Sequence, residues 1–217
     1  MNLSEELEIQ LTSDGSPTVY SKQFNATFHS SHGALQESLH VFIRNGFDTA
    51  AKNFPEIRIL EVGFGTGLNA LLTLRENKKT AYHAIEKYPL PESVYGQLDF
   101  GFGKEELLQL HDCEWEKDVA INPSFTFHKS KADIREIPLP ANYNLIYFDA
   151  FAPSTQQELW QSDLIRKMDD SLVPGGILVT FCAKGDFKRS LKSAGFTVQS
   201  PKGAAGKREM TRALRPF

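Results

Sequence analysis

Residues 58–74 read Arg-Ile-Leu-Glu-Val-Gly-Phe-Gly-Thr-Gly-Leu-Asn-Ala-Leu-Leu-Thr-Leu. The apolar run at 59–62 is typical of a short buried strand, and the glycines at 63, 65 and 67 indicate a tight loop before a helix that runs to about Arg75. A dinucleotide fingerprint, G-x-G-x-x-G, would need a glycine where the chain has Leu68. Glu61 precedes the loop, where a carboxylate would repel a pyrophosphate but suits a ligand that carries an ammonium or sulfonium charge. The stretch therefore predicts an α/β fold with a cationic ligand at the loop.

The composition agrees with one globular domain. The chain has 217 residues, of which 41% are hydrophobic and 24% charged, as in ordinary globular proteins. No apolar run approaches the ~20 residues of a membrane span, and the acidic N-terminus does not resemble a secretory signal. Cys113 and Cys182 are far apart, which argues against a disulfide framework or a zinc site. We therefore expect a cytoplasmic protein that does not associate with membranes.

The charge is distributed unevenly along the chain. Residues 184–217 hold nine Lys or Arg and two acids, a balance of +7, whereas the whole chain has a net charge of −3. A basic end on an otherwise acidic chain indicates an anionic partner such as nucleic acid. A solvated basic face without a partner explains the charge equally well.

The first fifty residues are expected to form an extension to the catalytic domain. Segments 7–11 and 18–20 alternate around a Ser-Asp-Gly-Ser turn, which predicts a β-hairpin. A helix is expected to begin near Leu35 and to stop at Asn45-Gly46. His29 and His32 lie between these elements, and without a further ligand to complete a metal site they are interpreted as loop polar groups. We expect a hairpin-and-helix extension at 1–50 and a catalytic domain at 51–217.

Three acids follow predicted strands. Glu86 ends a strand at 81–86, Asp133 follows a strand at 124–128, and Asp149 follows a strand at 143–148. Open α/β sheets bind ligands beyond the carboxyl ends of their parallel strands. We expect Glu86 to hold the ribose hydroxyls of an adenosine and Asp133 to face the adenine amino group. We place Asp149, in an aromatic loop that contains proline, at the reaction centre.

The remaining pattern alternates strands and helices. Thr155 and Glu158 form a T-x-x-E capping box for a helix whose core residues are Trp160, Leu164, Met168 and Leu172. Pro174-Gly175-Gly176 is expected to turn the chain into a strand at 177–181, and a helix at 187–194 follows. Segments 196–199 and 209–214 predict a closing antiparallel pair. This is the layout of a class I S-adenosylmethionine-dependent methyltransferase, a Rossmann-like, mostly parallel sheet with a C-terminal antiparallel hairpin.

Five motifs, in order, resemble one family. They lie at 61–69, 83–90, 148–153, 174–181 and 206–210, and the similarity extends from about Tyr20 to Leu214. The family is the methyltransferase domain of the tRNA 5-methylaminomethyl-2-thiouridine biosynthesis enzymes. The resemblance implies methyl transfer from S-adenosyl-L-methionine to the amino group of 5-aminomethyl-(2-thio)uridine at the wobble position of the tRNA anticodon loop. Many members also carry a C-terminal FAD-dependent oxidase that makes the aminomethyl group. The chain is expected to be either a stand-alone methyltransferase, served by a separate enzyme, or a piece of such a fusion.

The motifs also imply a set of site residues. For the cofactor they are Glu61, Gly63, Phe64, Gly65, Thr66, Gly67, Asn69, Glu86, Lys87, Asp133 and Asp149. For the acceptor they are Phe151, Pro153, Lys207, Arg208 and Glu209. Asp149 is the predicted catalytic residue, which orients the amine and stabilises the positive charge that develops on it. Base stacking is expected from Tyr20, Phe24, Phe28 and Phe151, and phosphate contacts from Lys202, Lys207, Arg208 and Arg212.

Three other functions compete with this one. A nicotinamide dehydrogenase is disfavoured by Leu68, by Glu61 and by the C-terminal hairpin. A partner that binds S-adenosylmethionine or RNA without turnover is disfavoured by Asp149 and the complete glycine loop. A methyltransferase that acts on a small-molecule amine is the strongest alternative, because the core motifs report the cofactor better than the acceptor.

Overall fold

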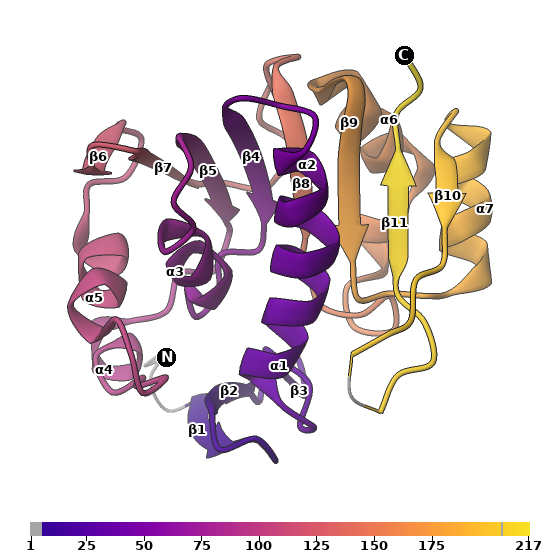
Figure 1. Ribbon diagram of the computed structural model, residues 1–217. Helices are drawn as coiled ribbons and strands as arrows, with labels where there is room; N and C mark the ends of the chain where they lie inside the picture. Colours follow the sequence, from indigo (N-terminus) through magenta and orange to yellow (C-terminus); the bar gives the residue numbers. More distant parts are fainter. Residues whose placement is uncertain (1–5, 205) are drawn as a thin grey trace.

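The computed structural model describes residues 6–204 and 206–217 and centres on one eight-stranded sheet (Figure 1). The strand order is β10-β11-β9-β8-β4-β5-β7-β6. The five central strands, from β9 to β7, pair in parallel, whereas β10, β11 and β6 pair antiparallel with their neighbours. The strands are β4 (Ile57–Val62), β5 (Thr80–Glu86), β6 (Val119–Asn122), β7 (Phe125–Lys131), β8 (Tyr143–Phe148), β9 (Leu172–Thr180), β10 (Thr197–Gln199) and β11 (Thr211–Leu214).

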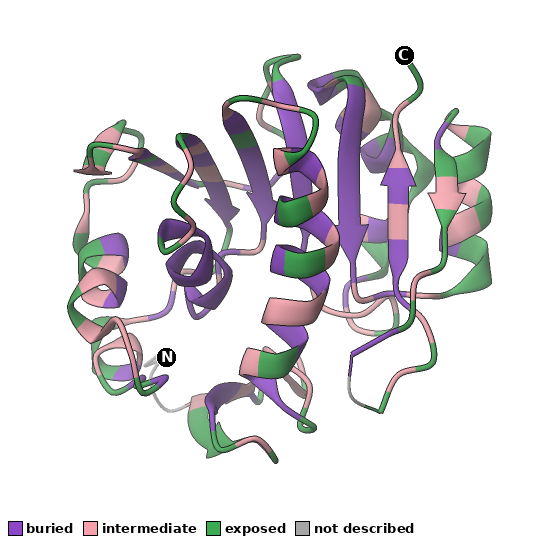
Figure 2. Cartoon of the chain, in the orientation of Figure 1, coloured by how far each residue is buried: buried purple, intermediate pink, exposed green. Residues whose placement is uncertain are grey.

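Helices cover both faces of this sheet. One face packs against the helix at 34–51 together with α3 and α5, and the other packs against α6 and α7. Figure 2 shows the central strands buried almost throughout. The helices are α1 (Ala34–Ser38), the π-helix η2 (Leu39–Phe47), α2 (Asp48–Ala51), α3 (Leu68–Leu74), α4 (Glu92–Tyr95), α5 (Lys104–Asp112), the 3-10 helix η3 (Gln157–Trp160), α6 (Ser162–Ser171) and α7 (Gly185–Ser193).

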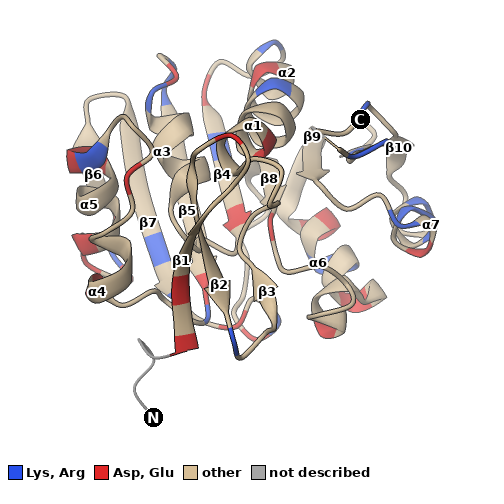
Figure 3. Cartoon of the chain, turned by 90° about the horizontal axis from the view of Figure 1, so that it is seen from below, with Lys and Arg blue, Asp and Glu red and all other residues tan. Residues whose placement is uncertain are grey.

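A second, three-stranded sheet lies across the carboxyl ends of the central strands (Figures 1 and 3). It consists of β1 (Leu7–Leu11), β2 (Pro17–Ser21) and β3 (Ala26–Thr27). The first two strands form the predicted hairpin, with Leu11 opposite Pro17. Val19 is fully buried and belongs to the main hydrophobic core. The small sheet is thereby fixed over the edge where open α/β sheets bind ligands.

Four local predictions were wrong, three of them in helical segments. The N-terminal helix does not stop at Asn45-Gly46 but continues to Ala51, because Gly46 packs against the sheet and leaves the helix unbroken. No capping box forms at Thr155, since residues 157–160 make a 3-10 turn and α6 begins at Ser162. Leu172 lies in β9 rather than in a helix, although it is buried as predicted together with Trp160, Leu164 and Met168.

The Pro174-Gly175-Gly176 segment is a bulge inside β9 rather than a turn before it. Leu172 pairs with Tyr143 and Ile177 pairs with Leu145, so β9 has extra residues between the two pairs. None of the helices formed by residues 6–204 and 206–217 has the length and hydropathy of a membrane-spanning segment.

Candidate active site

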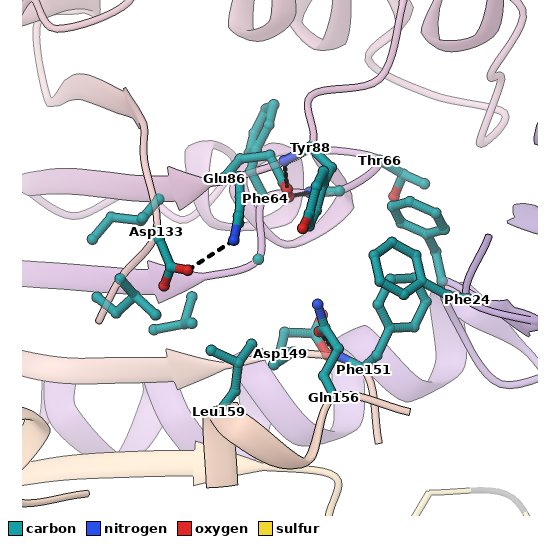
Figure 4. A pocket seen from close by; sticks show the side chains of 18 of the residues that line it. Phe24, Phe64, Thr66, Glu86, Tyr88, Asp133, Asp149, Phe151, Gln156 and Leu159 are labelled. Carbon is teal, nitrogen blue, oxygen red and sulfur yellow. Dashed lines mark hydrogen bonds and ion pairs between the residues drawn. The ribbon is translucent and has the colours of Figure 1, made fainter. Parts of the chain in front are cut away.

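A pocket opens at the carboxyl ends of β4, β5, β7 and β8, beneath the three-stranded sheet (Figure 4). Predicted site residues from all four strand ends meet in it, as expected for a parallel sheet. Those that line it are Gly63, Phe64, Gly65, Thr66, Asn69, Glu86, Lys87, Asp133, Asp149 and Phe151. The tertiary structure therefore brings together most of the residues that were predicted to hold the cofactor.

The glycine loop is shaped by contact with the end of β8. Gly63 has φ +91°, and a Cβ atom there would lie 2.7 Å from the carbonyl oxygen of Asp149. Only glycine allows this backbone conformation together with so close an approach. Gly67, at φ +77°, immediately precedes α3. The loop thus brings the amino end of α3 and the carboxyl end of β8 to one place.

One amide links the buried carboxylate of Glu61, beneath the pocket, to the half-buried carboxylate of Asp149 in the pocket lining. The Nδ2 of Asn69 donates to Glu61 Oε1 at 3.0 Å and to Asp149 Oδ2 at 2.8 Å. Burial raises the pKa of Glu61 well above its usual value, and the nearby charge of Asp149 raises it further. Burial, followed by the charge of Glu37, raises the pKa of Asp149 to about 7. A cation in this part of the pocket would favour the charged forms of both acids.

Two buried atoms of this group have no hydrogen bond of normal geometry to residues 6–204 or 206–217, although the Tyr82 hydroxyl lies near the Glu61 carboxylate. They are Glu61 Oε2 and Asn69 Oδ1, both acceptors. A buried polar atom without a partner is unfavourable and is usually satisfied by a ligand or water. An ammonium group supplies donors only. These acceptors therefore fit the amino group of an amino-acid-like cofactor such as S-adenosyl-L-methionine.

Glu86 is fixed at the end of β5 by backbone donors. Its Oε2 accepts from the N–H of Gly65 at 3.0 Å and its Oε1 from the N–H of Tyr88 at 2.7 Å. Burial raises the pKa of Glu86, and the backbone hydrogen bonds oppose that rise. Each oxygen keeps acceptor capacity for a second donor. The carboxylate is thus held against the glycine loop, and its predicted role in binding the ribose stays a prediction.

Asp133 forms ion pairs within the pocket wall. Lys87 Nζ lies 2.9 Å from its Oδ2, and the guanidinium of Arg135 lies 2.6 Å from the same oxygen. Hydrogen bonding to Arg135 is the main reason that the pKa of Asp133 is lowered. An adenine amino group at Asp133 would share the carboxylate with these two cations, so the predicted role of Asp133 stays a prediction.

Aromatic rings gather at the mouth of the pocket. Phe24 stacks on Phe151 with ring centroids 4.8 Å apart, and Phe28 meets Phe151 edge-on at 5.1 Å. Tyr88, whose side chain is exposed, packs against Phe24 at 5.4 Å. Figure 4 shows Phe24, Tyr88 and Phe151 around the same opening as Asp149. The mouth of the pocket is thus aromatic, and the predicted stacking role of these rings stays a prediction.

The loop after β8 is fixed by hydrogen bonds to both backbone groups of Phe151. Gln156 Oε1 accepts from the Phe151 N–H at 3.2 Å, and Trp160 Nε1 donates to the Phe151 carbonyl at 2.9 Å. These bonds replace the predicted capping box as the feature that orders this segment. Phe151 is therefore held beside the catalytic candidate Asp149.

Several pocket residues were not predicted. His29 is the clearest, because it was interpreted as a loop polar group, yet its imidazole lies between Thr18 at 3.2 Å and Thr66 at 3.3 Å. Burial lowers the pKa of His29 to about 4, so the ring is neutral at physiological pH. The other unpredicted lining residues include Tyr88, Arg135, Gln156, Glu158 and Leu159. No local sequence pattern marks His29, since the small sheet brings it to the pocket from far along the chain.

Other predicted residues lie outside the pocket lining. Glu61 is buried beneath it, and Gly67 begins α3 behind it. The remaining ones are Tyr20, Pro153, Lys202, Lys207, Arg208, Glu209 and Arg212. Glu209 pairs with Lys188 at 2.6 Å, and Arg212 bonds Thr49 and Gln199.

Comparison with known proteins places these features in context. A family model described as S-adenosyl-L-methionine-dependent methyltransferase matches residues 105–216. The chain is 31% identical to the tRNA 5-methylaminomethyl-2-thiouridine biosynthesis bifunctional protein MnmC of Cupriavidus necator, over 98% of this chain and 35% of the relative. The protein of the same name from Marinomonas sp. is 29% identical, over 91% and 32%. The chain thus spans about a third of the length of these curated relatives.

Solved structures confirm the predicted fold class. MnmC2 from Aquifex aeolicus superposes with a TM-score of 0.76 at 27% identity, over 97% of this chain and 72% of that chain. Spermidine synthase from Thermotoga maritima has a TM-score of 0.64 at 11% identity, over 96% and 68%. The second likeness is one of fold alone.

Proposed function

Because the chain belongs to the S-adenosyl-L-methionine-dependent methyltransferases, we propose that it methylates the amino group of 5-aminomethyl-(2-thio)uridine at the wobble position of tRNA. The product is 5-methylaminomethyl-(2-thio)uridine. The names of the curated relatives refer to biosynthesis of this nucleoside. The observation that carries the proposal is the position of Asp149, whose carboxylate lies in a pocket between a glycine loop and a cluster of aromatic rings. A separate enzyme activity is proposed to supply the aminomethyl group.

The cofactor site is assigned to the glycine-loop side of the pocket. Glu86 would hold the ribose hydroxyls, and Asp133 would face the adenine. Glu61 and Asn69 would accept from the amino group through the two atoms that lack partners. When bound, S-adenosyl-L-methionine supplies an electrophilic methyl group on a sulfonium. The residues contribute by fixing its position, because alignment of reacting groups accounts for a large part of many rate enhancements.

Asp149 is proposed to orient the acceptor amine and to stabilise the charge that develops on its nitrogen. An ordinary Asp, near pKa ~3.9, is mismatched by more than ~6 pKa units with an alkylammonium near ~10. The pKa of about 7 that burial gives Asp149 roughly halves this gap, to about 4 kcal/mol. The sulfonium of bound S-adenosyl-L-methionine would lower the pKa of Asp149 again, so we assign its carboxylate to orientation and charge stabilisation, with water as the final proton acceptor.

The acceptor is proposed to enter from the aromatic mouth. A wobble base has to leave its stack before its substituent can reach a buried carboxylate. Phe24, Phe28 and Phe151 offer ring faces and edges near Asp149, and Tyr88 extends the cluster to the surface. Stacking on such rings is worth about 1–3 kcal/mol per base.

Mass spectrometry of nucleosides tests this function directly. Protein and S-adenosyl-L-methionine are incubated with tRNA that carries unmethylated 5-aminomethyluridine, and the tRNA is then digested. We expect the wobble nucleoside to gain one methyl group. Asp149→Asn should lower kcat about 100-fold or more, since it removes the charge that stabilises the transition state, while the Kd for S-adenosyl-L-methionine from calorimetry changes less than about threefold.

Two results would contradict the proposal. Equal loss of turnover and of cofactor affinity in Asp149→Asn would mean that Asp149 serves the cofactor rather than the acceptor. Absence of methylation on tRNA, with cofactor binding intact, would leave the family assignment in place and redirect the search to small-molecule amines.

A further inference from the structure

A second depression lies beside the active site, between the N-terminal helix and the loop that joins β10 to β11. Figure 1 shows this loop next to α1 at the lower end of the sheet. One wall comes from Gln36, His40 and Arg44, which are spaced four residues apart and share one helix face. The other wall comes from the loop, including Lys202 and Lys207. We call this feature the basic groove.

The basic groove has cations on both walls and no carboxylate among its described lining residues. Arg44 and Lys202 are exposed, and among residues 6–204 and 206–217 neither forms an ion pair. The side chain of Arg208 next to it is 95% exposed. Arg208 pairs with Glu209 at 3.9 Å and Lys207 pairs with Glu37, so Arg44 and Lys202 are the groove cations left for a ligand. In a chain with a net charge of −3, two such cations on facing walls indicate an anionic ligand.

The two walls are tied together. His40 Nε2 lies 2.7 Å from the carbonyl oxygen of Lys202, and an ion pair joins Lys207 to Glu37 of α1. Lys207 also lies over the ring of Phe181, 4.5 Å from its centroid. The spacing between Arg44 and Lys202 is therefore set by the fold rather than by chance approach of long side chains.

The inner end of the basic groove reaches toward the active site. Lys207 belongs to the groove, and its charge lowers the pKa of Asp149, whereas its partner Glu37 raises that pKa. Glu37 also accepts from the backbone N–H of Ser30 at 3.0 Å, next to the pocket residue His29, so the groove and the pocket adjoin at this point. A chain whose acceptor group is at Asp149 would have its neighbouring backbone near the groove.

We propose that the basic groove binds backbone phosphates of single-stranded RNA adjacent to the nucleotide in the active site, with Arg44 and Lys202 as the outer contacts. The inference rests on the proposed tRNA function. Arg offers paired donors that match a phosphate, and Lys offers a point charge. Such contacts position a strand without reading its sequence, so the groove would set which nucleotide of the loop reaches Asp149.

The test measures RNA binding separately from methyl transfer. The double variant Arg44→Glu/Lys202→Glu is compared with Lys52→Glu/Lys192→Glu, which changes net charge equally at two exposed lysines on α2's carboxyl end and on α7. Fluorescence anisotropy with a labelled anticodon stem-loop gives Kd over a range of salt concentrations. We expect the groove variant to raise Kd about tenfold or more. We also expect its log–log salt dependence to be shallower by about 1.4–1.8, for two lost phosphate contacts.

The outcomes separate this inference from the proposed function. Equal Kd and salt slope in the groove and control variants, with tRNA still methylated by the wild type, would overturn the groove and leave the function standing. If the groove variant raises the Kd for RNA but the wild type does not methylate tRNA, the groove is confirmed as an RNA-binding site. The proposal that tRNA is the methyl acceptor is then refuted. Thermal unfolding and the Kd for S-adenosyl-L-methionine, expected to be unchanged in both variants, show that the fold is intact.

Discussion

At the scale of single residues, the site depends on two carboxylates that share one amide. Asn69 donates to Glu61 and to Asp149, and burial raises the pKa of both acids. Perturbed acids in a cleft are typical of functional sites, because the protein tolerates unfavourable charge where a ligand later compensates it. A positively charged cofactor and an amine acceptor are the complementary ligands for such a pair.

This arrangement predicts how stability depends on pH. The folded-state pKa of Asp149, about 7, exceeds the ~3.9 of an ordinary aspartate, so the folded protein binds the extra proton more tightly than the unfolded chain. The stabilisation from that proton is present below the unfolded pKa and is lost as pH rises through about 7. The Asp149→Asn variant has no carboxyl group to titrate at this position, so it does not lose this stabilisation as the pH rises. We expect the Tm difference between variant and wild type to be larger at pH 8 than at pH 4, by roughly 3–8 °C after allowance for partial exposure.

Differential scanning calorimetry of the ligand-free protein measures this difference. The charge of Asp149 raises the pKa of Glu61, so the Tm difference reports these two acids as a pair, whereas the titrations of the more distant acids cancel. A Tm difference that stays constant between pH 4 and pH 8 would contradict the raised pKa of Asp149.

At the scale of elements, the N-terminal helix is positioned by a glycine in its middle. Asn45-Gly46 has the composition of a helix end, yet the helical run from Ala34 to Ala51 continues through it as a π-helical segment. A Cβ atom on Gly46 would lie 2.9 Å from Val179 Cγ2 and 3.2 Å from Tyr147 Cε1. Gly46 is therefore required because the helix lies directly on β8 and β9.

Overpacking this contact should destabilise the protein. We expect Gly46→Leu to lower the free energy of unfolding by about 1–3 kcal/mol, because Val179 and Tyr147 are fully buried and have little room to move. Lys52→Leu, at the exposed C-cap of the same helix, serves as the control and should change the free energy of unfolding by less than about 0.5 kcal/mol. Urea denaturation followed by circular dichroism compares them. Equal stability of the two variants would mean that the helix can lift from the sheet at little cost.

At the scale of the whole molecule, the active site is assembled from both sheets. The parallel sheet supplies the acids and the glycine loop, and the small sheet and its connection to α1 supply Phe24, Phe28 and His29. The division at residue 50 stays a prediction. The helix at 34–51 nevertheless contributes Phe42 and Phe47 to the main core, together with Val41 and Ala50.

Two truncations should therefore behave differently. Removal of residues 1–31 takes away the small sheet but keeps the helix, and we expect a folded protein with a lower Tm and no measurable methyl transfer. Removal of residues 1–51 also exposes the sheet face that Phe42 and Phe47 cover, and we expect an insoluble or unfolded product. Circular dichroism, thermal unfolding and the nucleoside assay distinguish the cases. Methyl transfer by the first truncation would show that the small sheet is dispensable for the site.

The sequence by itself determined the parallel sheet, the glycine loop and the acids at the strand ends. Buried strands, glycine spacing and the residue after a strand are local patterns, and topology places the carboxyl ends of parallel strands at one edge. This is why Glu86, Asp133 and Asp149 were predicted to lie together, and they all line the pocket.

Only the tertiary structure decided what covers that edge. His29 lies against Thr66, and Lys207 pairs with Glu37, across separations of 37 and 170 residues. The helix likewise continues past Gly46 because a sheet lies beneath it, which no propensity in the local sequence reveals. Contacts of this kind depend on the packing of distant segments, so they follow from the folded chain and not from any pattern along it.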